Sequence, residues 1–379
     1  MTGDAAGNQH SAGTAARVLI TVPCLDLPGG VANYYRTLRP HLDSRKSYFE
    51  VGTRPGQTSR WAAIPRLLSD YWRFHRELGA RPVDLVHINP SLGTRSVVRD
   101  GILLLIAKAH RRPVLVFFRG WDPAFEAVIR ARYALIFRLV YGRADAFVVL
   151  AEEFGRSLRE LGLRAPVTVE TTVVADAVFA EGALARGDGE RAPESCEILY
   201  LSRLDRDKGL VEAIGAVAEV SERFPSVTLT VAGDGPERAP AEALVRTWGL
   251  PRVTFAGYLD DDARSKAFRR ADIFLFPTSF GEGMPNAVLE AMAFGLPVVT
   301  RPVGGIRDFF EDGRMGFVTE SRSPEVFAGY LARLIADPAL RSSLGRYNRE
   351  YARKRFAASV VAARLLEIYA QVGRQAAVR

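Results

Sequence analysis

The chain has 379 residues, of which 48% are hydrophobic and 25% charged; it is long enough for two domains of ordinary size and has the composition of a globular protein. It contains no run of 18 apolar residues, so no transmembrane helix is expected, and its two cysteines form no metal-binding or disulfide framework. The net charge is +8, with +6 in residues 1–190 (25 Lys and Arg against 19 Asp and Glu) and +2 in residues 191–379 (26 against 24). This excess suits an anionic partner, but no zinc spacing, RNP sequence or continuous basic run indicates a nucleic acid.

The first half of the chain predicts a parallel α/β domain. Residues 1–15 are small and polar, lack the charged-then-apolar order of a signal peptide, and are expected to be a disordered tail of a cytoplasmic protein. From residue 16 to residue 180, short β-rich runs alternate with helical patterns. The expected strands are residues 17–22, 49–52, 84–88, 113–118, 146–150 and 167–171.

A glycine-rich loop follows the first expected strand. Residues 27–31 read LPGGV, and Gly29 and Gly30 would let backbone amides reach a phosphate or an acceptor. A generic strand–helix turn is the alternative. His87 ends another expected strand and is interpreted as a hydrogen-bonded core histidine, with an approach to a binding cleft as the alternative.

Two arginine-containing segments of this half allow both a binding and a structural role. Arg119 lies in residues 117–122, FFRGWD, where it could bind a hydroxyl or phosphate or form an ion pair with Asp122 or Glu126. Residues 60–76 mix four arginines with aromatic and aliphatic side chains. This segment could rest on an anionic membrane, or it could be an amphipathic helix that packs on its own sheet.

The second half predicts another domain of the same class. Residues 181–195, EGALARGDGERAPES, are small and charged and indicate a linker. A second alternation of strands and helices extends over residues 196–356, and helical sequence closes the chain from about residue 324. The expected strands are residues 197–201, 227–232, 253–256, 273–276 and 297–300.

Loops of the second half carry further candidates. Arg203 and Lys208 lie in LSRLDRDKG after a strand, where two cations could neutralise a diphosphate, although surface arginines and lysines are usually solvated. The VAGDGP turn at residues 231–236 is interpreted as mainly structural. Tyr258 could pack on a nucleobase or be an ordinary core or rim aromatic.

The most informative segment is residues 279–300, SFGEGMPNAVLEAMAFGLPVVT. Its glycines allow a tight turn before a helix in which Pro285 suits the first position and Gly295 the stop. Free amides at such a helix start bind phosphate. Glu282 precedes the helix and Glu290 lies about five residues into it, so the two carboxylates would serve opposite ends of a ligand shaped like a nucleotide-sugar. The alternative is an ordinary strand–loop–helix with a solvated loop carboxylate.

These motifs, in this order, resemble retaining glycosyltransferases of the GT-B fold, glycosyltransferase family 4 (glycosyl transferases group 1) in particular. Residues 272–300 resemble the donor-site signature, and residues 202–209 the G/S-R-x-x-x-x-K-G element. The family's GG-x-x-E loop is similar to residues 304–308, where Asp308 replaces the glutamate. Family members commonly have a histidine where this chain has Arg119. The resemblance spans nearly the whole chain.

The resemblance implies two doubly wound Rossmann-like α/β domains that face each other across a cleft, with the last helix, at about residues 357–375, packed back on the first domain. It implies that Glu290 binds the ribose hydroxyls and Glu282 the sugar hydroxyls, and that Arg203 and Lys208 hold the diphosphate. The implied catalytic residues are Glu282, Arg203 and Lys208, together with Arg119. Further donor contacts are implied for Gly29, Gly30, Tyr258, Gly283, Met284, Pro285 and Asn286.

The implied function is retaining, metal-independent transfer of a sugar from a nucleoside diphosphate to an acceptor hydroxyl, without a cofactor. The acceptor is expected to be a glycan or a lipid-linked molecule in cell-surface polysaccharide, lipopolysaccharide or glycolipid synthesis. The expected location is the cytoplasm, with peripheral contact to the anionic inner face of the plasma membrane as an added option. Two alternatives stay open: a nucleotide-sugar epimerase or phosphorylase on the same fold, and a non-enzymatic, basic surface-binding protein.

Overall fold

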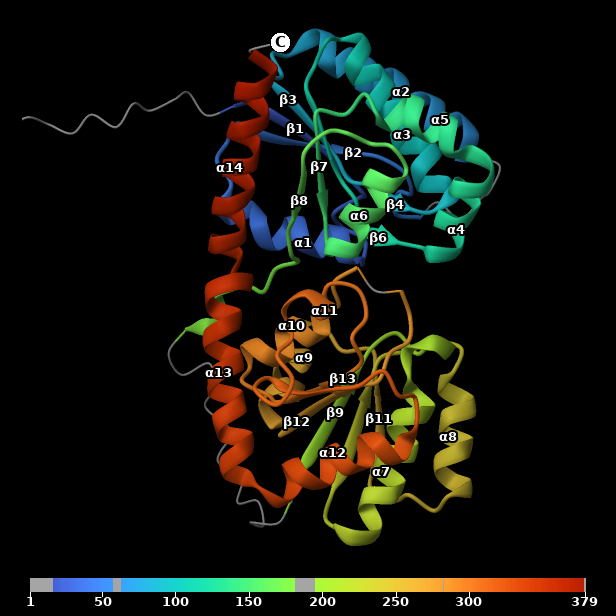
Figure 1. Cartoon of the computed structure of the whole chain (residues 1–379), viewed down its shortest axis with the longest axis vertical. Coiled ribbons are helices and arrows are strands. Elements are labelled where there is room, and N and C mark those ends of the chain that lie inside the picture. The colour runs from blue at the N-terminus through green and yellow to red at the C-terminus, as the bar shows by residue number, and fades with distance from the viewer. Residues whose placement is uncertain (1–15, 57–62, 181–194, 282, 378–379) are drawn as a thin grey trace, which may run out of the picture.

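The computed structural model describes residues 16–56, 63–180, 195–281 and 283–377. The expected tail at 1–15, nearly all of the expected linker at 181–195, and Glu282 lie outside the described residues. The described chain forms two α/β halves, one above the other in Figure 1, and each half is built on a six-stranded parallel sheet.

The N-terminal half has helices on both faces of its sheet. Its strands are β1 (Val18–Val22), β2 (Lys46–Glu50), β3 (Leu85–Ile88), β5 (Val114–Phe117), β7 (Ala146–Val149) and β8 (Val167–Val169), with a short pair, β4 (Ser91–Leu92) and β6 (Gly120–Trp121), at their ends. Its helices are α1 (Gly30–Leu38), α2 (Ala63–Ala80), α3 (Thr94–Ala109), α4 (Pro123–Val128), α5 (Ala134–Tyr141) and α6 (Glu152–Glu160). The strand order is β2-β1-β3-β5-β7-β8. Helices α2, α3, α5 and α6 pack on one face and α1 on the other, which is why the central strands are apolar on both sides.

The C-terminal half repeats this design around one continuous core. Its strands are β9 (Glu197–Leu201), β10 (Thr228–Ala232), β11 (Val253–Gly257), β12 (Ile273–Phe276), β13 (Val298–Thr300) and β14 (Gly316–Val318). Its helices are α7 (Leu210–Arg223), α8 (Arg238–Thr247), α9 (Asp261–Arg270), α10 (Asn286–Ala293), α11 (Ile306–Phe309) and α12 (Pro324–Ala336). The strand order, β11-β10-β9-β12-β13-β14, is that of a doubly wound sheet.

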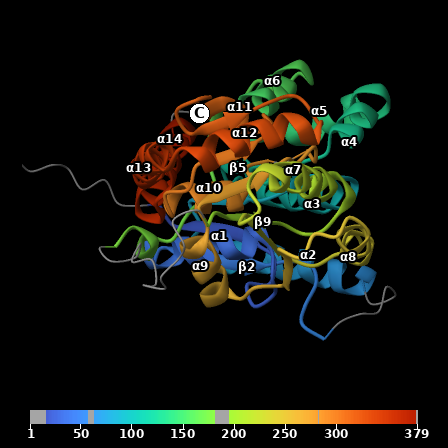
Figure 2. The same ribbon diagram turned by 90° about the horizontal axis from the view of Figure 1, so that it is seen from below.

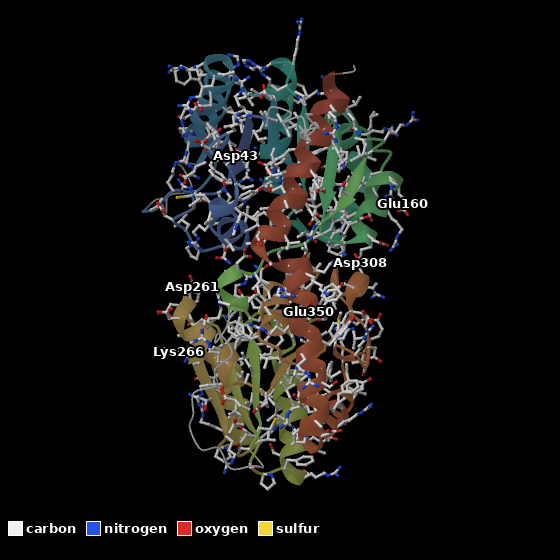
Figure 3. The ribbon with its side chains drawn as sticks, turned by 90° about the vertical axis from the view of Figure 1, so that its left-hand side faces the viewer. Asp43, Glu160, Asp261, Lys266, Asp308 and Glu350 are labelled. Carbon is white, nitrogen blue, oxygen red and sulfur yellow. The ribbon has the colours of Figure 1, made fainter. Side chains whose placement is uncertain are left out.

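Two long helices at the end of the chain span both halves. Helix α13 (Pro338–Phe356) packs on α10 in the C-terminal half, and α14 (Ala358–Ala377) packs on α1 and β3 in the N-terminal half. Figure 3 faces these two helices. The chain passes between them at Ala357, which bridges to Val174. Val361, Leu365 and Tyr369 of α14 belong to the core on that face of the N-terminal sheet.

The fold is the expected one, with differences at strand boundaries. The expected strand at 49–52 has the wrong limits, because β2 pairs residue by residue with β1 from Lys46 to Glu50 and the chain turns at Gly52. Strand β14 and the pair β4–β6 were not expected, because runs of two or three residues carry no readable period. Among the described residues, no helix combines the length and the apolar character needed to cross a bilayer.

Candidate active site

Strand order in the C-terminal sheet reverses between β9 and β12, and candidate residues gather there. Strand β9 pairs with β10 on one side and with β12 on the other. In an open parallel sheet, ligands bind beyond the carboxyl ends of the strands at such a switch point. The loop after β9 carries Arg203 and Lys208, and the loop after β12 carries Gly283 and leads into α10 with Glu290.

Lys208 is held between the two loops. It ends a short 3-10 turn (Arg206–Lys208) and is only 8% exposed. Its Nζ lies 4.0 Å from the centre of the Phe280 ring in the next loop. Gly209 follows with a φ of 79°, and a Cβ there would overlap the carbonyl oxygen of Pro277. A residue with a side chain would therefore push the two loops apart, which gives a physical reason for the lysine–glycine pair.

Arg203 occupies a different environment. Its side chain is 70% exposed and pairs with Asp205 of the same loop. The two cations of the motif thus divide into a buried lysine and a solvent-facing arginine that can swing toward a ligand.

Helix α10 begins at the switch point, close to the N-terminal half. It starts at Asn286, and Pro285 occupies the N-cap position with an extended ψ of 111°. The expectation that Pro285 is the first helical residue is therefore wrong by one position. The predicted stop is confirmed, because the N–H of Gly295 donates to the carbonyl oxygen of Met292. The amides of the first turn have no partner within the helix, so they suit an anion.

Glu290 is a buried carboxylate one turn into α10. Its side chain is 14% exposed, and its Oε2 lies 3.5 Å from Nε of Arg264 in α9. Burial raises the pKa of Glu290 to about 7; Arg264 opposes this shift and Asp261 adds to it. Arg264 also pairs with Asp261 at 2.9 Å, so its charge is shared between the two carboxylates. A carboxylate that is desolvated and only partly compensated is suited to accept hydrogen bonds from ligand hydroxyls.

The N-terminal half places a second helix start beside α10. A Cβ on Gly30, the first residue of α1, would lie 4.0 Å from Nδ2 of Asn286, the first residue of α10. Two helix N-termini, each with a partial positive charge, thus lie close together from opposite halves. The loop after β5 lies beside the start of α10, since a Cβ on Gly283 would lie 3.3 Å from the carbonyl oxygen of Arg119.

Arg119 stacks on the ring of Tyr34. Asp122 and Glu126, the two carboxylates considered from sequence as its ion-pair partners, have other partners. Its guanidinium lies 3.7 Å from the centre of the Tyr34 ring. Asp122 accepts from backbone amides as the N-cap of α4, and Glu126 accepts from Trp121 Nε1 at 2.6 Å and pairs with Arg130. The structural ion pair with Asp122 or Glu126 is therefore not formed.

Several buried polar atoms at this junction have no hydrogen-bond partner among the described residues. They are Nε and Nη1 of Arg119, the hydroxyl of Tyr34 and Oδ1 of Asn286. An unsatisfied buried polar atom costs about 1–3 kcal/mol, so native structures rarely keep several together without a use. Donors and acceptors from both halves therefore point to a polar ligand between them.

The loop at residues 303–308 makes direct contact with the N-terminal half. A Cβ on Gly305 would overlap the carbonyl oxygen of Leu150 and the side chain of Met284. Oδ2 of Asp308 accepts from the backbone N–H of Glu152 at 2.7 Å, which caps the start of α6 from the opposite half. Figure 3 shows Asp308 at the level where the halves meet. Burial raises the pKa of Asp308. A cavity of about 240 Å³ lies beside this contact and is lined by Met284 and Asp308, among others.

Two further candidates behave differently. His87 is a satisfied core residue, as expected: its Nδ1 lies 2.7 Å from the hydroxyl of Tyr369 in α14, and burial lowers its pKa to about 3. Tyr258 follows the edge strand β11 and is 75% exposed, which excludes the core interpretation. Its contact with a nucleobase stays a prediction.

The sequence did not indicate Arg264 or Tyr34 as site residues. Arg264 belongs to a strongly charged helix, DDARSKAFRR, in which nothing distinguishes it from its neighbours. Tyr34 lies four residues after Gly30, on the buried face of α1. The helical period predicts that it is buried, but not that Arg119 stacks on it.

Two family models match the chain. One, described as glycosyl transferases group 1, matches residues 185–351, and the other, described as a glycosyl transferase 4-like domain, matches residues 4–171. Together they span most of the sequence.

Similar proteins include an alpha-D-kanosaminyltransferase of Streptomyces kanamyceticus, 30% identical over 178 residues (46% of each chain). A phosphatidyl-myo-inositol mannosyltransferase of Mycobacterium leprae is 31% identical over 179 residues, again 46% of each chain. The chain spans about half the length of these curated relatives. The solved structure of Anabaena Alr3699/HepE with UDP and glucose has a TM-score of 0.73 at 18% identity, covering 94% of this chain and 99% of that one.

Proposed function

We propose that this chain, which belongs to the group 1 glycosyltransferases of the GT-B fold, transfers a sugar from a nucleoside diphosphate to an acceptor hydroxyl. The observation that supports this most directly is the set of unpartnered polar atoms near two neighbouring helix starts, drawn from Arg119 and Tyr34 on one side and Asn286 on the other. A diphosphate between the halves would meet amides, helix dipoles and guanidinium N–H groups at once. Comparable proteins are named as transferases of several different sugars.

The donor is proposed to lie along the switch point of the C-terminal sheet. Glu290, ionised in the complex, accepts hydrogen bonds from the two ribose hydroxyls, and the exposed Tyr258 lies beside the base. Lys208 and Arg203 hold the diphosphate and stabilise the charge that develops on it as the sugar leaves. Glu282 is assigned to the sugar hydroxyls on the family resemblance alone.

Backbone groups complete the donor site in this proposal. The amides of Gly283, Met284 and Asn286 contact sugar and phosphate at the start of α10, with Pro285 fixing the turn. The Gly29–Gly30 loop contributes amides from the other half. Arg119, with two free N–H positions, occupies the place of the family's histidine and binds the transferred sugar or its phosphate.

The chemistry is proposed to retain the anomeric configuration. The acceptor attacks on the face that the diphosphate leaves, and a phosphate oxygen takes the acceptor proton. The two cations of the β9 loop carry the charge stabilisation that a metal ion supplies in other transferases, so neither a metal nor a cofactor is included. Residues 16–180 with the helix at about 357–375 would form the acceptor domain and residues 196–356 the donor domain, joined by the linker at 181–195. Closure of the two would exclude water.

The acceptor is proposed to be a glycan or a lipid-linked hydroxyl used in cell-surface polysaccharide, lipopolysaccharide or glycolipid synthesis. The positive net charge, concentrated in residues 1–190, suits an anionic acceptor or membrane face. A cytoplasmic enzyme with peripheral membrane contact follows from this assignment.

Nucleotide binding tests the donor site. Thermal unfolding would be followed with UDP, GDP, ADP and their common sugars, first without metal and then with magnesium. One nucleotide should raise the unfolding temperature, and Glu290→Ala should lose that shift whereas Glu222→Ala, at an exposed position of α7, should keep it. No shift with any nucleotide would contradict the proposal. Lys208→Ala should abolish transfer, and NMR of the product would establish whether the configuration is retained.

A further inference from the structure

One surface of the N-terminal half exposes an unusual number of large apolar side chains. Five of them belong to the continuous helical segment formed by α4, a π-helical turn (Ile129–Tyr133) and α5, and each is between 42% and 60% exposed: Val128, Tyr133, Leu135, Ile136 and Leu139. Val98 and Ile102 of the neighbouring helix α3 are also exposed. We call these seven residues the α3–α5 surface. Contiguous apolar exposure of this kind marks an interaction site.

A groove deepens this surface between α3 and α5. It has a volume of about 400 Å³, and its walls include Val97, Leu105, Phe125, Ile136 and Val140. Nearly all of its lining is aliphatic or aromatic, so it suits a hydrocarbon chain and not a hydrated sugar.

The charge around the groove is positive. Residues 127–144, AVIRARYALIFRLVYGRA, contain four arginines and no acidic residue. Arg132 and Arg138 are exposed on the same turns as the apolar side chains. Aliphatic side chains with interspersed arginines are typical of a helix that lies in the interface of an anionic bilayer. A second copy of the chain is a poorer partner, because it would bring like charges face to face.

This surface begins where the two halves meet. Pro123, the first residue of α4, lies so close to the loop after β12 that a Cβ on Gly281 would be 3.2 Å from its Cδ. Phe125, two residues further along α4, already lines the groove. Figures 1 and 2 show α4 and α5 at the edge of the N-terminal half that lies away from α14.

Helix α2, the segment considered from sequence for membrane contact, is a weaker candidate. It buries Phe74 and Leu78 against the sheet, as an amphipathic helix does, and it exposes Ile64, Leu68 and Trp72 as a second stripe. Residues 63–80 hold three arginines against two carboxylates. Residues 127–144 hold four arginines and no carboxylate, and of these only Arg130 forms ion pairs with carboxylates among the described residues, Glu126 and Glu160, so the α3–α5 surface keeps the larger positive excess.

We propose that the α3–α5 surface docks on an anionic membrane, with the groove receiving a hydrocarbon chain and the cleft opening toward a hydroxyl at the bilayer surface. The proposal rests on the proposed function for the placement of the acceptor at the cleft.

Co-sedimentation of the full chain with vesicles tests it. Vesicles of phosphatidylcholine alone would be compared with vesicles that also contain phosphatidylglycerol. The chain should bind the anionic vesicles and be released by salt. Leu135→Ser with Leu139→Ser, and separately Arg132→Glu with Arg138→Glu, should each weaken binding at least about tenfold. Matched controls at exposed positions of the other half, Val211→Ser with Trp248→Ser and Arg246→Glu with Arg252→Glu, should bind as the parent does.

Four results would overturn the proposal: no binding by the parent chain, equal binding by the α5 variants, loss of binding only in Leu68→Ser with Trp72→Ser, or a dimer in light scattering that the α5 variants dissociate. The nucleotide-induced thermal shift, measured on every variant, reports that the fold persists. If the parent shows no nucleotide shift but binds vesicles through α5, the proposed function fails and the docking surface stands. If a nucleotide raises the unfolding temperature but the α5 substitutions do not change vesicle binding, the docking surface is refuted and the proposed function is not.

Discussion

Replacement of Glu290 by glutamine gives a stability change that can be calculated from the structure. Burial raises the pKa of Glu290 from the usual 4.5 to about 7. The folded chain therefore holds this proton between those pH values while the unfolded chain has lost it, so stability falls as pH rises through the interval and does not recover above it. A shift of about 2.5 units at about 1.36 kcal/mol each amounts to roughly 3 kcal/mol. Glutamine is neutral at every pH and escapes this cost.

Urea unfolding at pH 5 and pH 8.5 would measure the difference. Glu290→Gln should be more stable than the parent chain by about 1 kcal/mol at pH 5 and by about 3 kcal/mol at pH 8.5. Glu222→Gln, at an exposed position of α7, is the matched control and should show no such divergence. A constant difference between Glu290→Gln and the parent across this range would refute the reasoning, because it would mean that Arg264, 3.5 Å away, keeps the carboxylate ionised throughout.

The ionisation of Glu290 should also govern ligand binding. If ribose hydroxyls donate to the ionised carboxylate, the nucleotide affinity of the parent chain should rise up to tenfold per pH unit below pH 7 and level off above it. Titration calorimetry that finds the same affinity at every pH would contradict this assignment. Gly305→Ala should destabilise the chain by about 1–3 kcal/mol, because its Cβ would overlap a carbonyl oxygen of the other half, and urea unfolding should show a larger loss than Gly329→Ala, where nothing lies within 4 Å. Tyr369→Phe should cost about 1–3 kcal/mol of unfolding free energy, since it leaves Nδ1 of His87 without its partner at 2.7 Å; an unchanged urea midpoint would show that water replaces the hydroxyl. Arg119→Met should lower the rate of transfer about 100-fold with little change in nucleotide affinity, and steady-state kinetics showing parental rates would reduce Arg119 to a stacking partner of Tyr34.

Local patterns predicted the strands and the loops that follow them, because apolar β-rich runs and glycine-rich turns are short-range features. Strand β9 was predicted to the residue, and the stop of α10 at Gly295 likewise. The limits of β2 were not, since they depend on pairing with β1 along its whole length. Boundaries set by a partner strand are invisible to a single segment.

Contacts between distant segments account for what the sequence did not indicate. Arg264 reaches Glu290 only because α9 and α10 pack side by side, and Asp308 caps α6 only because the two halves meet. The apolar run in α5 illustrates the same limit for burial. Its spacing is that of a helix that packs on a sheet, and only the packed structure shows that Leu135 and Leu139 are left on the outside.

The return of α14 to the N-terminal half has a consequence for how the chain is made. Val361, Leu365 and Tyr369 complete one face of a core whose other residues, such as Ile20 and Tyr35, are the earliest of the fold to be synthesised. The C-terminal half needs nothing beyond Phe356 for its own core. As the chain leaves the ribosome, the second half can therefore finish folding while the first still exposes the face that α14 will cover. The core of the N-terminal half, which contains the first strand of the fold, is thus complete only after the last helix of the described chain has been made.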